Sequence, residues 1–202
     1  DSDFSWKDFR ARNNNELCSI YGNFVNRSLV LTQKYYDGKA PSLGGLITID
    51  KKVIIELKEI PKQVEIDIRA FRFRDALSKA MSLARLGNKY LAETEPWKLI
   101  KSNPERVKTV MNISLQITAS LTIILEPFMP KKSNELASLL NIDLKKWDNA
   151  GNENLISEGH QINKPNILFT KIEDDKIEKQ IEKLEFSSRK QSKYPPMKEE
   201  IT

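Results

Sequence analysis

The sequence predicts an all-α protein folded as an antiparallel helical bundle, and three observations lead to this prediction. Apolar residues recur at helical spacing through most of residues 14–140. Proline and glycine interrupt this pattern at intervals that predict five or more helices joined by mostly short loops. Aromatic residues make up only 8% of the 202-residue chain and charged residues 30%, a balance that fits a helix-rich protein with a solvated surface. A chain of this length has room for one domain with a substantial core.

The N-terminal part of the chain predicts two helices. Ser5 can cap a short one by accepting a free backbone N–H. A longer one begins at Asn14 or Asn15 and ends at Asp37-Gly38, because glycine takes the left-handed conformation without a steric penalty. Residues 38–49 are expected to form a loop. The longer helix is expected to bury one face, made of Leu17, Ile20, Tyr21, Phe24, Ser28, Leu31 and Tyr35.

The middle of the chain predicts a pair of helices. Asp50 can cap the first, Pro61 should kink or interrupt it, and residues 64–68 alternate as a strand would. The second covers about residues 72–93. The expected core positions of the first are Val53, Leu57, Ile60, Val64, Ile68 and Phe71. Those of the second are Phe73, Leu77, Ala80, Met81, Ala84 and Leu91.

The remaining elements are set by helix start and stop signals. Asn103-Pro104-Glu105 is a good helix start, and that helix should run to about Glu126. A shorter helix over 131–140, an irregular stretch over 141–170 and a charged helix over 173–186 follow. Residues 187–202 have no core pattern, so we expect a bundle over 1–186 and a tail or linker after it. The core positions of the 103–126 helix are expected to be Val107, Val110, Met111, Ser114, Ile117, Leu121 and Leu125.

The composition excludes several classes of chemistry. Cys18 and His160 are the single cysteine and histidine, so neither an internal disulfide nor a Cys/His zinc site can form. The sequence has no glycine-rich phosphate loop, no apolar run of about 18 residues and no signal-peptide pattern. We therefore expect no catalytic residue, no metal and no cofactor in this chain. We expect a cytoplasmic binding or structural module without a membrane partner.

The charge is unevenly distributed along the chain. Residues 1–110 carry 20 basic and 14 acidic side chains, a net of +6, and residues 111–202 carry 13 and 14, a net of −1. A positive first half suits a partner with phosphate groups. Before any motif is considered, a slightly lysine-rich solvated surface is the better explanation of an excess of this size.

Asn23 and Arg27 are the first candidate binding residues. They are four residues apart, so their side chains lie next to each other on a helix. An amide and a planar fork of donors together suit the edge of an unpaired base. On spacing alone, ordinary surface residues that satisfy local polar groups remain the favoured alternative.

Trp97 is the second candidate. It follows Pro96 at a helix break, where a rigid aromatic ring can stay partly exposed and stack on an unpaired base. The alternative is a ring that fills the end of the bundle. Trp6, Trp147 and His160 are expected to be structural.

A series of short motifs surrounds these candidates. In order they are Phe9-x-x-Arg12-x-Asn14-x-x-Leu17, Gly22-Asn23-x-x-x-Arg27, Tyr36-Asp37-Gly38, Glu95-Pro96-Trp97-Lys98, Leu125-Glu126-Pro127-Phe128-Met129-Pro130, Gly159-His160-x-Ile162-x-x-Pro165 and Leu168-Phe169-x-Lys171-Ile172-Glu173. Their order and spacing over residues 3–186 resemble the anticodon-binding domain of methionyl-tRNA synthetases.

The resemblance implies a fold, a partner and a role for each candidate. The fold is the helical bundle shared by related class I synthetases, and the partner is a methionine-accepting tRNA with the anticodon CAU. Asn23 and Arg27 match the positions that contact the first anticodon base, a cytosine, and Trp97 matches the position that stacks on it. The parent enzyme attaches methionine to tRNA with ATP. Its catalytic domain, which would bind ATP and could also hold zinc, is not in this sequence. In some members a dimerising domain follows, to which residues 187–202 could be the linker.

Two alternatives stay open at this point. The first is a structural helical bundle that binds protein partners, which would bind no RNA. The second is the anticodon-binding domain of another class I aminoacyl-tRNA synthetase, which would lack the Asn23, Arg27 and Trp97 set at this spacing.

Overall fold

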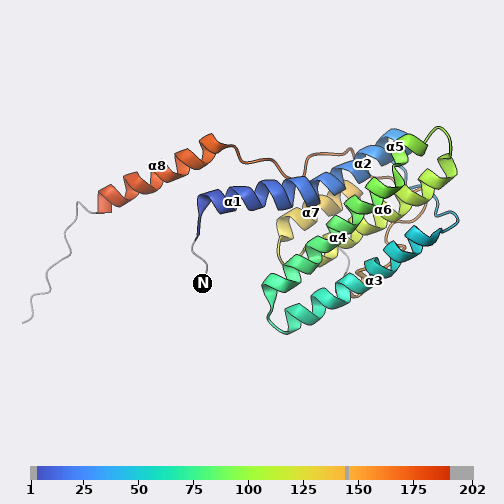
Figure 1. Cartoon of the computed structure of the whole chain (residues 1–202), viewed down its shortest axis with the longest axis horizontal. Coiled ribbons are helices and arrows are strands. Elements are labelled where there is room, and N and C mark those ends of the chain that lie inside the picture. The colour runs from blue at the N-terminus through green and yellow to red at the C-terminus, as the bar shows by residue number, and fades with distance from the viewer. Residues whose placement is uncertain (1–3, 144–145, 192–202) are drawn as a thin grey trace, which may run out of the picture.

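A computed structural model describes residues 4–143 and 146–191, and it is all-α over those residues (Figure 1). The fold class predicted from the sequence is confirmed. The elements are α1 (Trp6–Arg12), π-helix η1 (Asn13–Gly22), α2 (Asn23–Tyr36), α3 (Thr48–Arg69), α4 (Phe73–Thr94), α5 (Pro96–Leu99), α6 (Pro104–Ile124), α7 (Pro130–Leu140), 3₁₀-helix η2 (Trp147–Asn149) and α8 (Asp174–Gln191).

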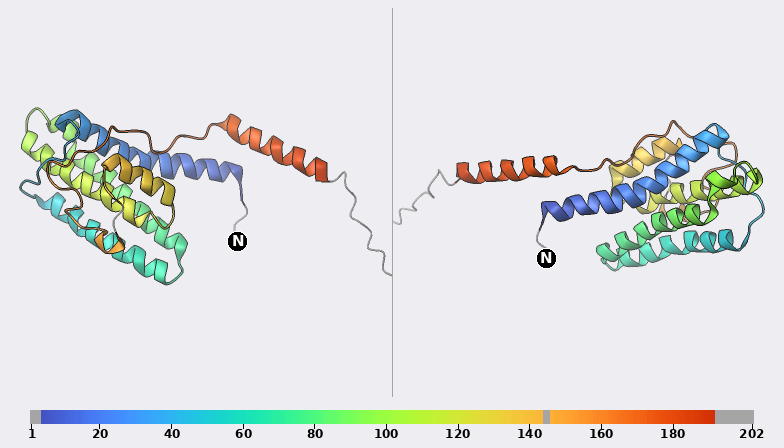
Figure 2. Two further views of the ribbon diagram at one scale, coloured as in Figure 1. Left: turned by 180° about the vertical axis from the view of Figure 1, so that it is seen from behind. Right: turned by 45° about the horizontal axis from the view of Figure 1, so that its top comes forward.

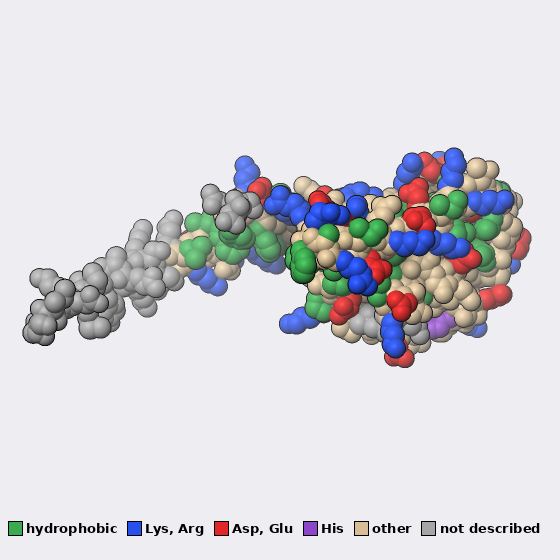
Figure 3. Space-filling view, turned by 90° about the horizontal axis from the view of Figure 1, so that it is seen from below, with side chains coloured by type: hydrophobic (Ala, Val, Ile, Leu, Met, Phe, Trp, Pro, Cys, Tyr) green, Lys and Arg blue, Asp and Glu red, His purple; other side chains and the backbone are tan. Residues whose placement is uncertain are grey.

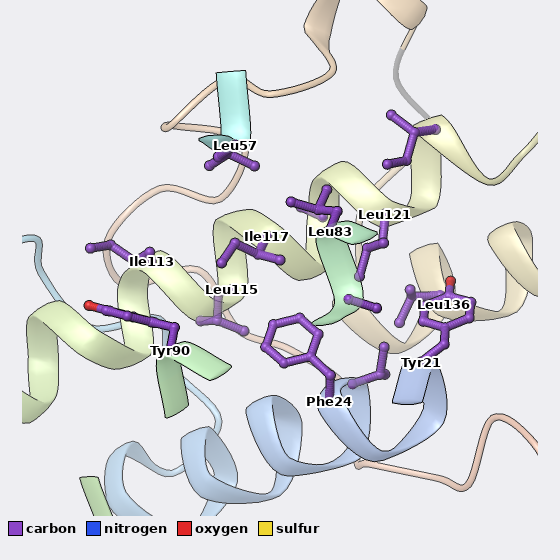
Figure 4. Close-up of a cluster of buried hydrophobic side chains, with 14 of the residues drawn as sticks. Tyr21, Phe24, Leu57, Leu83, Tyr90, Ile113, Leu115, Ile117, Leu121 and Leu136 are labelled. Atoms are coloured by element: carbon purple, nitrogen blue, oxygen red, sulfur yellow. The ribbon is translucent and has the colours of Figure 1, made fainter. Parts of the chain in front are cut away.

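Helix α6 is the centre of the bundle. It packs against α2, α3, α4 and α7, and nearly all of its side chains are buried (Figures 1 and 4). All seven core positions predicted for it are buried. Its buried hydroxyls bond to carbonyls of their own helix, as Ser114 Oγ does to Val110 O at 2.8 Å and Thr118 Oγ1 to Ser114 O at 2.7 Å. A helix that is buried on nearly all sides, with its polar groups hydrogen-bonded, is typical of the interior of a bundle.

Helix α6 also corrects one sequence expectation. Among the described residues it is long and apolar enough to cross a membrane by length and composition, although no apolar run of that length was expected. In this structure 94% of its most apolar 18-residue window lies inside the bundle. The apolar character of α6 is therefore explained by its central position.

The two predicted N-terminal helices form one continuous helical run. Ser5 caps it as expected, with its hydroxyl accepting from the Asp8 amide at 3.4 Å. Asn14 does not begin a helix. Its side chain instead pairs with the backbone of Ile172, donating to the carbonyl and accepting from the amide, both at 2.9 Å. Asn14 therefore holds the returning C-terminal segment against η1.

The buried face of the η1–α2 run differs from the predicted one. Tyr21, Phe24 and Ser28 are buried as predicted, but Leu17, Ile20, Leu31 and Tyr35 are only half-buried. A π-helix contains more residues per turn than an α-helix, so a face counted at 3.6 residues per turn drifts across it. The fully buried positions that the pattern missed are Val25, Leu29 and Thr32.

The α3–α4 hairpin departs from prediction in two ways. Pro61 does not interrupt α3, and residues 64–68 belong to that helix as predicted, although they alternate as a strand would. Pro61 cannot donate to the carbonyl of Leu57, and the backbone of Gly151 packs against that carbonyl, where a Cβ would leave too little room. Phe71, Phe73 and Leu77 were expected in the core but are 80%, 55% and 37% exposed, because the hairpin tip extends beyond the other helices. The other predicted core positions of α3 and α4 are buried, except the half-buried Ile68.

The C-terminal segment crosses the bundle before α8 leads away from it beside the N-terminal end of α1 (Figure 2). Arg10 and Asp174 form an ion pair there. Helix α8 continues to Gln191, so the first residues of the expected tail are helical, and residues 192–202 lie outside the described part.

Candidate nucleic-acid interface

The structure brings the three candidate residues together from two helices. Asn23 is the first residue of α2 and Arg27 lies one turn later, while Trp97 is the second residue of α5. The guanidinium carbon of Arg27 lies 4.6 Å from the centroid of the Trp97 ring. This distance is typical of a cation–π contact. Helices α2 and α5 lie side by side at one end of the bundle (Figure 1), so residues far apart in sequence form one surface.

The turn before α5 places Trp97 at the surface. Glu95 ends α4 in the left-handed conformation, with φ of 40°, and Pro96 is the buried first residue of α5. Proline suits this position because its φ is already helical and it has no N–H to satisfy. The indole of Trp97 is left 37% exposed. This exposure favours a ring that is available for stacking over one that fills the end of the bundle.

Asn23 is held by a residue that the sequence did not single out. Its Nδ2 donates to Oδ1 of Asn88 on α4 at 3.0 Å. The Nδ2 of Asn88 donates in turn to the carbonyls of Ile20 at 2.8 Å and Ala84 at 3.2 Å. Asn88 therefore ties α4 to both η1 and α2.

Gly87 allows this contact because it brings α4 close to α2. A Cβ at position 87 would overlap the ring of Phe24, which is fully buried. An isolated glycine within a helical pattern commonly marks such a close approach. Gly87 was therefore a signal in the sequence that another helix approaches α4 closely. The sequence pattern did not indicate which helix that is or which side chains come into contact.

Asn23, Arg27 and Asn88 line an open hollow of about 440 Å³ between α4 and the η1–α2 run. It contains three basic side chains: Arg27, Arg85 and Lys89. Arg85 forms an ion pair with Glu16, and Lys89 Nζ lies 3.8 Å from Glu93 Oε1. The hollow thus combines amides and cations, and the exposed ring of Trp97 lies beside it against Arg27. Proteins recognise single-stranded nucleic acids with groups of these kinds.

The opposite, α3 side of the bundle differs in character. Basic and acidic side chains are interspersed over the face seen from below in Figure 3. The excess of basic over acidic side chains, a net charge of +5 for the chain, is therefore not concentrated on that face.

A buried polar network braces the end of the bundle that carries Trp97. Both carboxylate oxygens of Asp50 on α3 accept from the guanidinium of Arg106 on α6, each at 2.7 Å. Asp50 also accepts from the Tyr90 hydroxyl at 2.6 Å and from the Ile47 amide at 2.9 Å. Helix α3 begins at Thr48, so Asp50 acts from inside the first turn and not, as expected, from the cap position.

The hydrogen bonds decide the protonation state of Asp50. Its burial favours the neutral acid, but the bonds from Arg106, Tyr90 and Ile47 outweigh that effect and lower the pKa of Asp50 below its ordinary value. Asp50 is therefore ionised at neutral pH and fixes the start of α6 against α3 and α4.

The other polar candidates have structural surroundings. His160 Nε2 lies 2.8 Å from the Leu140 carbonyl, which confirms its expected loop role. Trp147 packs half-buried against the core, and Trp6 meets Phe4 edge to face. Partial burial raises the pKa of the Cys18 thiol, so it is not an activated nucleophile. Within residues 4–143 and 146–191, no cluster of three or more His, Cys, Asp or Glu could hold a metal.

Comparison with known families gives a match over most of the chain. Residues 40–190 match the family model described as the anticodon binding domain of methionyl tRNA ligase. The chain is 55% identical over 184 residues to a methionine–tRNA ligase of Bacteroides fragilis, covering 91% of the chain and 27% of that relative. It is 52% identical over 206 residues to one from Cytophaga hutchinsonii, covering all of the chain and 30% of that relative. The chain thus spans under a third of the length of these relatives.

Solved structures agree on the fold. The chain superposes on the methionyl-tRNA synthetase of Mycobacterium tuberculosis in its apo form with a TM-score of 0.77 at 21% identity, covering 84% of this chain and 35% of that one. The same enzyme in complex with methionyl-adenylate gives a TM-score of 0.74 at 22% identity. The bundle is therefore an arrangement also present in these larger proteins.

Proposed function

Since this chain belongs to the family of anticodon-binding domains of methionyl-tRNA ligases, we propose that it recognises the CAU anticodon of a methionine-accepting tRNA. In this proposal it is part of a longer cytoplasmic methionine–tRNA ligase, whose catalytic part attaches methionine to that tRNA with ATP. Any zinc in the catalytic part and any dimerisation through a following domain belong to that longer protein.

The observation that carries the proposal is the stacking of Arg27 on Trp97 next to Asn23. An unpaired first anticodon base can stack on the exposed indole, while the Asn23 amide and the Arg27 guanidinium meet its edge. Lys89 and Arg85 lie in the same hollow, where they can approach the phosphates that flank the base. Stacking and phosphate contacts then supply affinity, and the edge contacts supply the choice of base.

Binding of RNA stem-loops that differ in one base tests this function. The full 202-residue chain is titrated with a stem-loop that carries CAU and with matched loops that carry U, A or G at the first anticodon position. We expect the cytosine loop to bind most tightly, and its affinity to fall as salt increases because phosphate contacts release counterions. Equal affinity for all four loops would reject base recognition, and no RNA binding at all would favour a bundle that serves protein partners.

A further inference from the structure

The orientation of the Asn88 amide is fixed by what surrounds it. The carbonyls of Ile20 and Ala84 can only accept hydrogen bonds, so the nitrogen of Asn88 must face both of them. Its oxygen then has to face Asn23. Because this argument uses the hydrogen-bonding capacity of each group, it distinguishes the two ends of an amide that have nearly the same shape.

The orientation of Asn23 follows from that of Asn88. With an oxygen opposite it, Asn23 must present its nitrogen to Asn88, and this leaves the oxygen of its exposed amide directed away from Asn88. Among the described residues, none donates to that oxygen. The surface at Asn23 is thus prepared as an acceptor.

We propose that Asn88 is a positioning residue that makes the site select cytosine over uracil by fixing the Asn23 amide with its oxygen outward. This inference rests on the proposed function. Cytosine carries an amino donor at position 4, where uracil carries an oxygen acceptor. An acceptor fixed at Asn23 accepts a hydrogen bond from the amino group of cytosine and repels the oxygen of uracil. An unfixed amide can rotate by 180° and offer its nitrogen to uracil, which removes the distinction.

The same reasoning assigns a different task to Arg27. A guanidinium offers only donors, and cytosine and uracil share the acceptor oxygen at position 2. A donor from Arg27 to that oxygen strengthens the binding of both bases without separating them, whereas a donor to position 3, an acceptor in cytosine and an N–H in uracil, adds to the preference for cytosine. The Asn88–Asn23 pair is the part of the site that reads position 4.

The first test measures the ratio of affinities for cytosine-first and uracil-first stem-loops. We expect Asn88→Ala to reduce the wild-type ratio by about fivefold or more, the low end of what a base-edge contact contributes. Asn88→Leu removes the same hydrogen bonds at similar volume, and we expect the same reduction. Asn134→Ala is the matched control, because it removes an exposed asparagine that bonds a helix carbonyl on α7, away from the hollow. Its ratio should equal that of wild type.

Rescue separates positioning from simple structural support. A carboxylate is an acceptor in either orientation, so Asn23→Asp combined with Asn88→Ala should restore the preference for cytosine. Failure of the double variant to regain it, while the protein remains folded, would count against the proposal. A single Asn88→Ala variant that binds RNA with an unchanged ratio would overturn it and leave the proposed function intact.

A change in the RNA gives a test that does not depend on any variant folding. Replacing the first cytosine by 2-pyrimidinone removes only the amino group at position 4. We expect the wild-type chain to bind this loop more weakly than the cytosine loop and more tightly than the uracil loop. Equal binding of the pyrimidinone and cytosine loops would refute an acceptor at this point. Equal binding of cytosine and uracil loops would instead reject the proposed function itself.

Discussion

Replacing Trp97 by alanine should weaken RNA binding without unfolding the bundle. The indole is 37% exposed, lies against the guanidinium of Arg27 and is not part of the buried cluster around α6, so we expect its removal to open no cavity in that core. Stacking of a base on an aromatic side chain contributes about 1–3 kcal/mol when measured by alanine substitution. Loss of that contact raises the dissociation constant by about 5- to 150-fold.

The Arg27 contact adds a second, smaller term to this prediction. A cation over an exposed aromatic ring contributes about 0.5–1 kcal/mol, and removing the ring also frees Arg27 to move. The effects of Trp97→Ala and Arg27→Ala should therefore be less than additive in a double-mutant cycle. Additive effects would mean that the two side chains bind the RNA independently.

The assay is titration of a CAU stem-loop with each variant, with thermal unfolding followed by circular dichroism. Phe71→Ala is the control, because it removes another exposed ring, 80% accessible, at the far tip of the α3–α4 hairpin (Figure 1). That variant should bind as wild type does. The reasoning is refuted if Trp97→Ala binds with unchanged affinity, or if it loses its cooperative unfolding transition, since the latter would make Trp97 a core residue.

Three further predictions concern the residues around the site. Arg27→Ala should cost about 1–3 kcal/mol of binding free energy for the CAU stem-loop. A variant that binds as wild type would remove Arg27 from the interface. Gly87→Ala should lower the free energy of unfolding by about 1–3 kcal/mol in denaturant titration, because the added Cβ overlaps the buried Phe24 ring; unchanged stability would contradict the close approach of α2 and α4. The pKa of Asp50 is lower in the folded state, so the contribution of Asp50 to stability is complete above the ordinary carboxyl pKa and is lost as pH falls through the lower folded value. Asp50→Asn should therefore destabilise the protein at pH 7 and reduce the loss of stability on acidification. Identical profiles of unfolding free energy against pH for the two proteins would disprove this role.

The sequence predicted much of the fold because the relevant signals are local. The start of α6 is specified by Asn103 and Pro104, and its core face by apolar spacing, so both were confirmed. The same holds for the break before Trp97, where Pro96 decides the local backbone. Capping, proline geometry and periodicity act over a few residues and can be read without knowing what lies opposite.

The predictions failed where a helical face was extrapolated from periodicity over many residues, or where the burial of a side chain depended on another helix. The π-helical turns of η1 made a face counted at 3.6 residues per turn drift before α2, and the buried face of α2 itself was decided by the helices that pack on it. Phe71 and Phe73 have a core-like pattern, but no helix reaches the hairpin tip to cover them. Pro61 was expected to disturb α3, and the packing of Gly151 against the Leu57 carbonyl accompanies its uninterrupted course.

By itself, the sequence determined the all-α class, the positions of most helices and the kinds of side chain at positions 23, 27 and 97. Only the tertiary structure decided that Arg27 stacks on Trp97 and that Asn88 holds Asn23. The physical reason is that a side chain's own chemistry is fixed by its residue type, whereas its hydrogen-bond partner depends on which helix faces meet. Gly87 permits the close packing of α2 on α4, and only the packed helices show that this brings Asn88 within hydrogen-bond distance of Asn23.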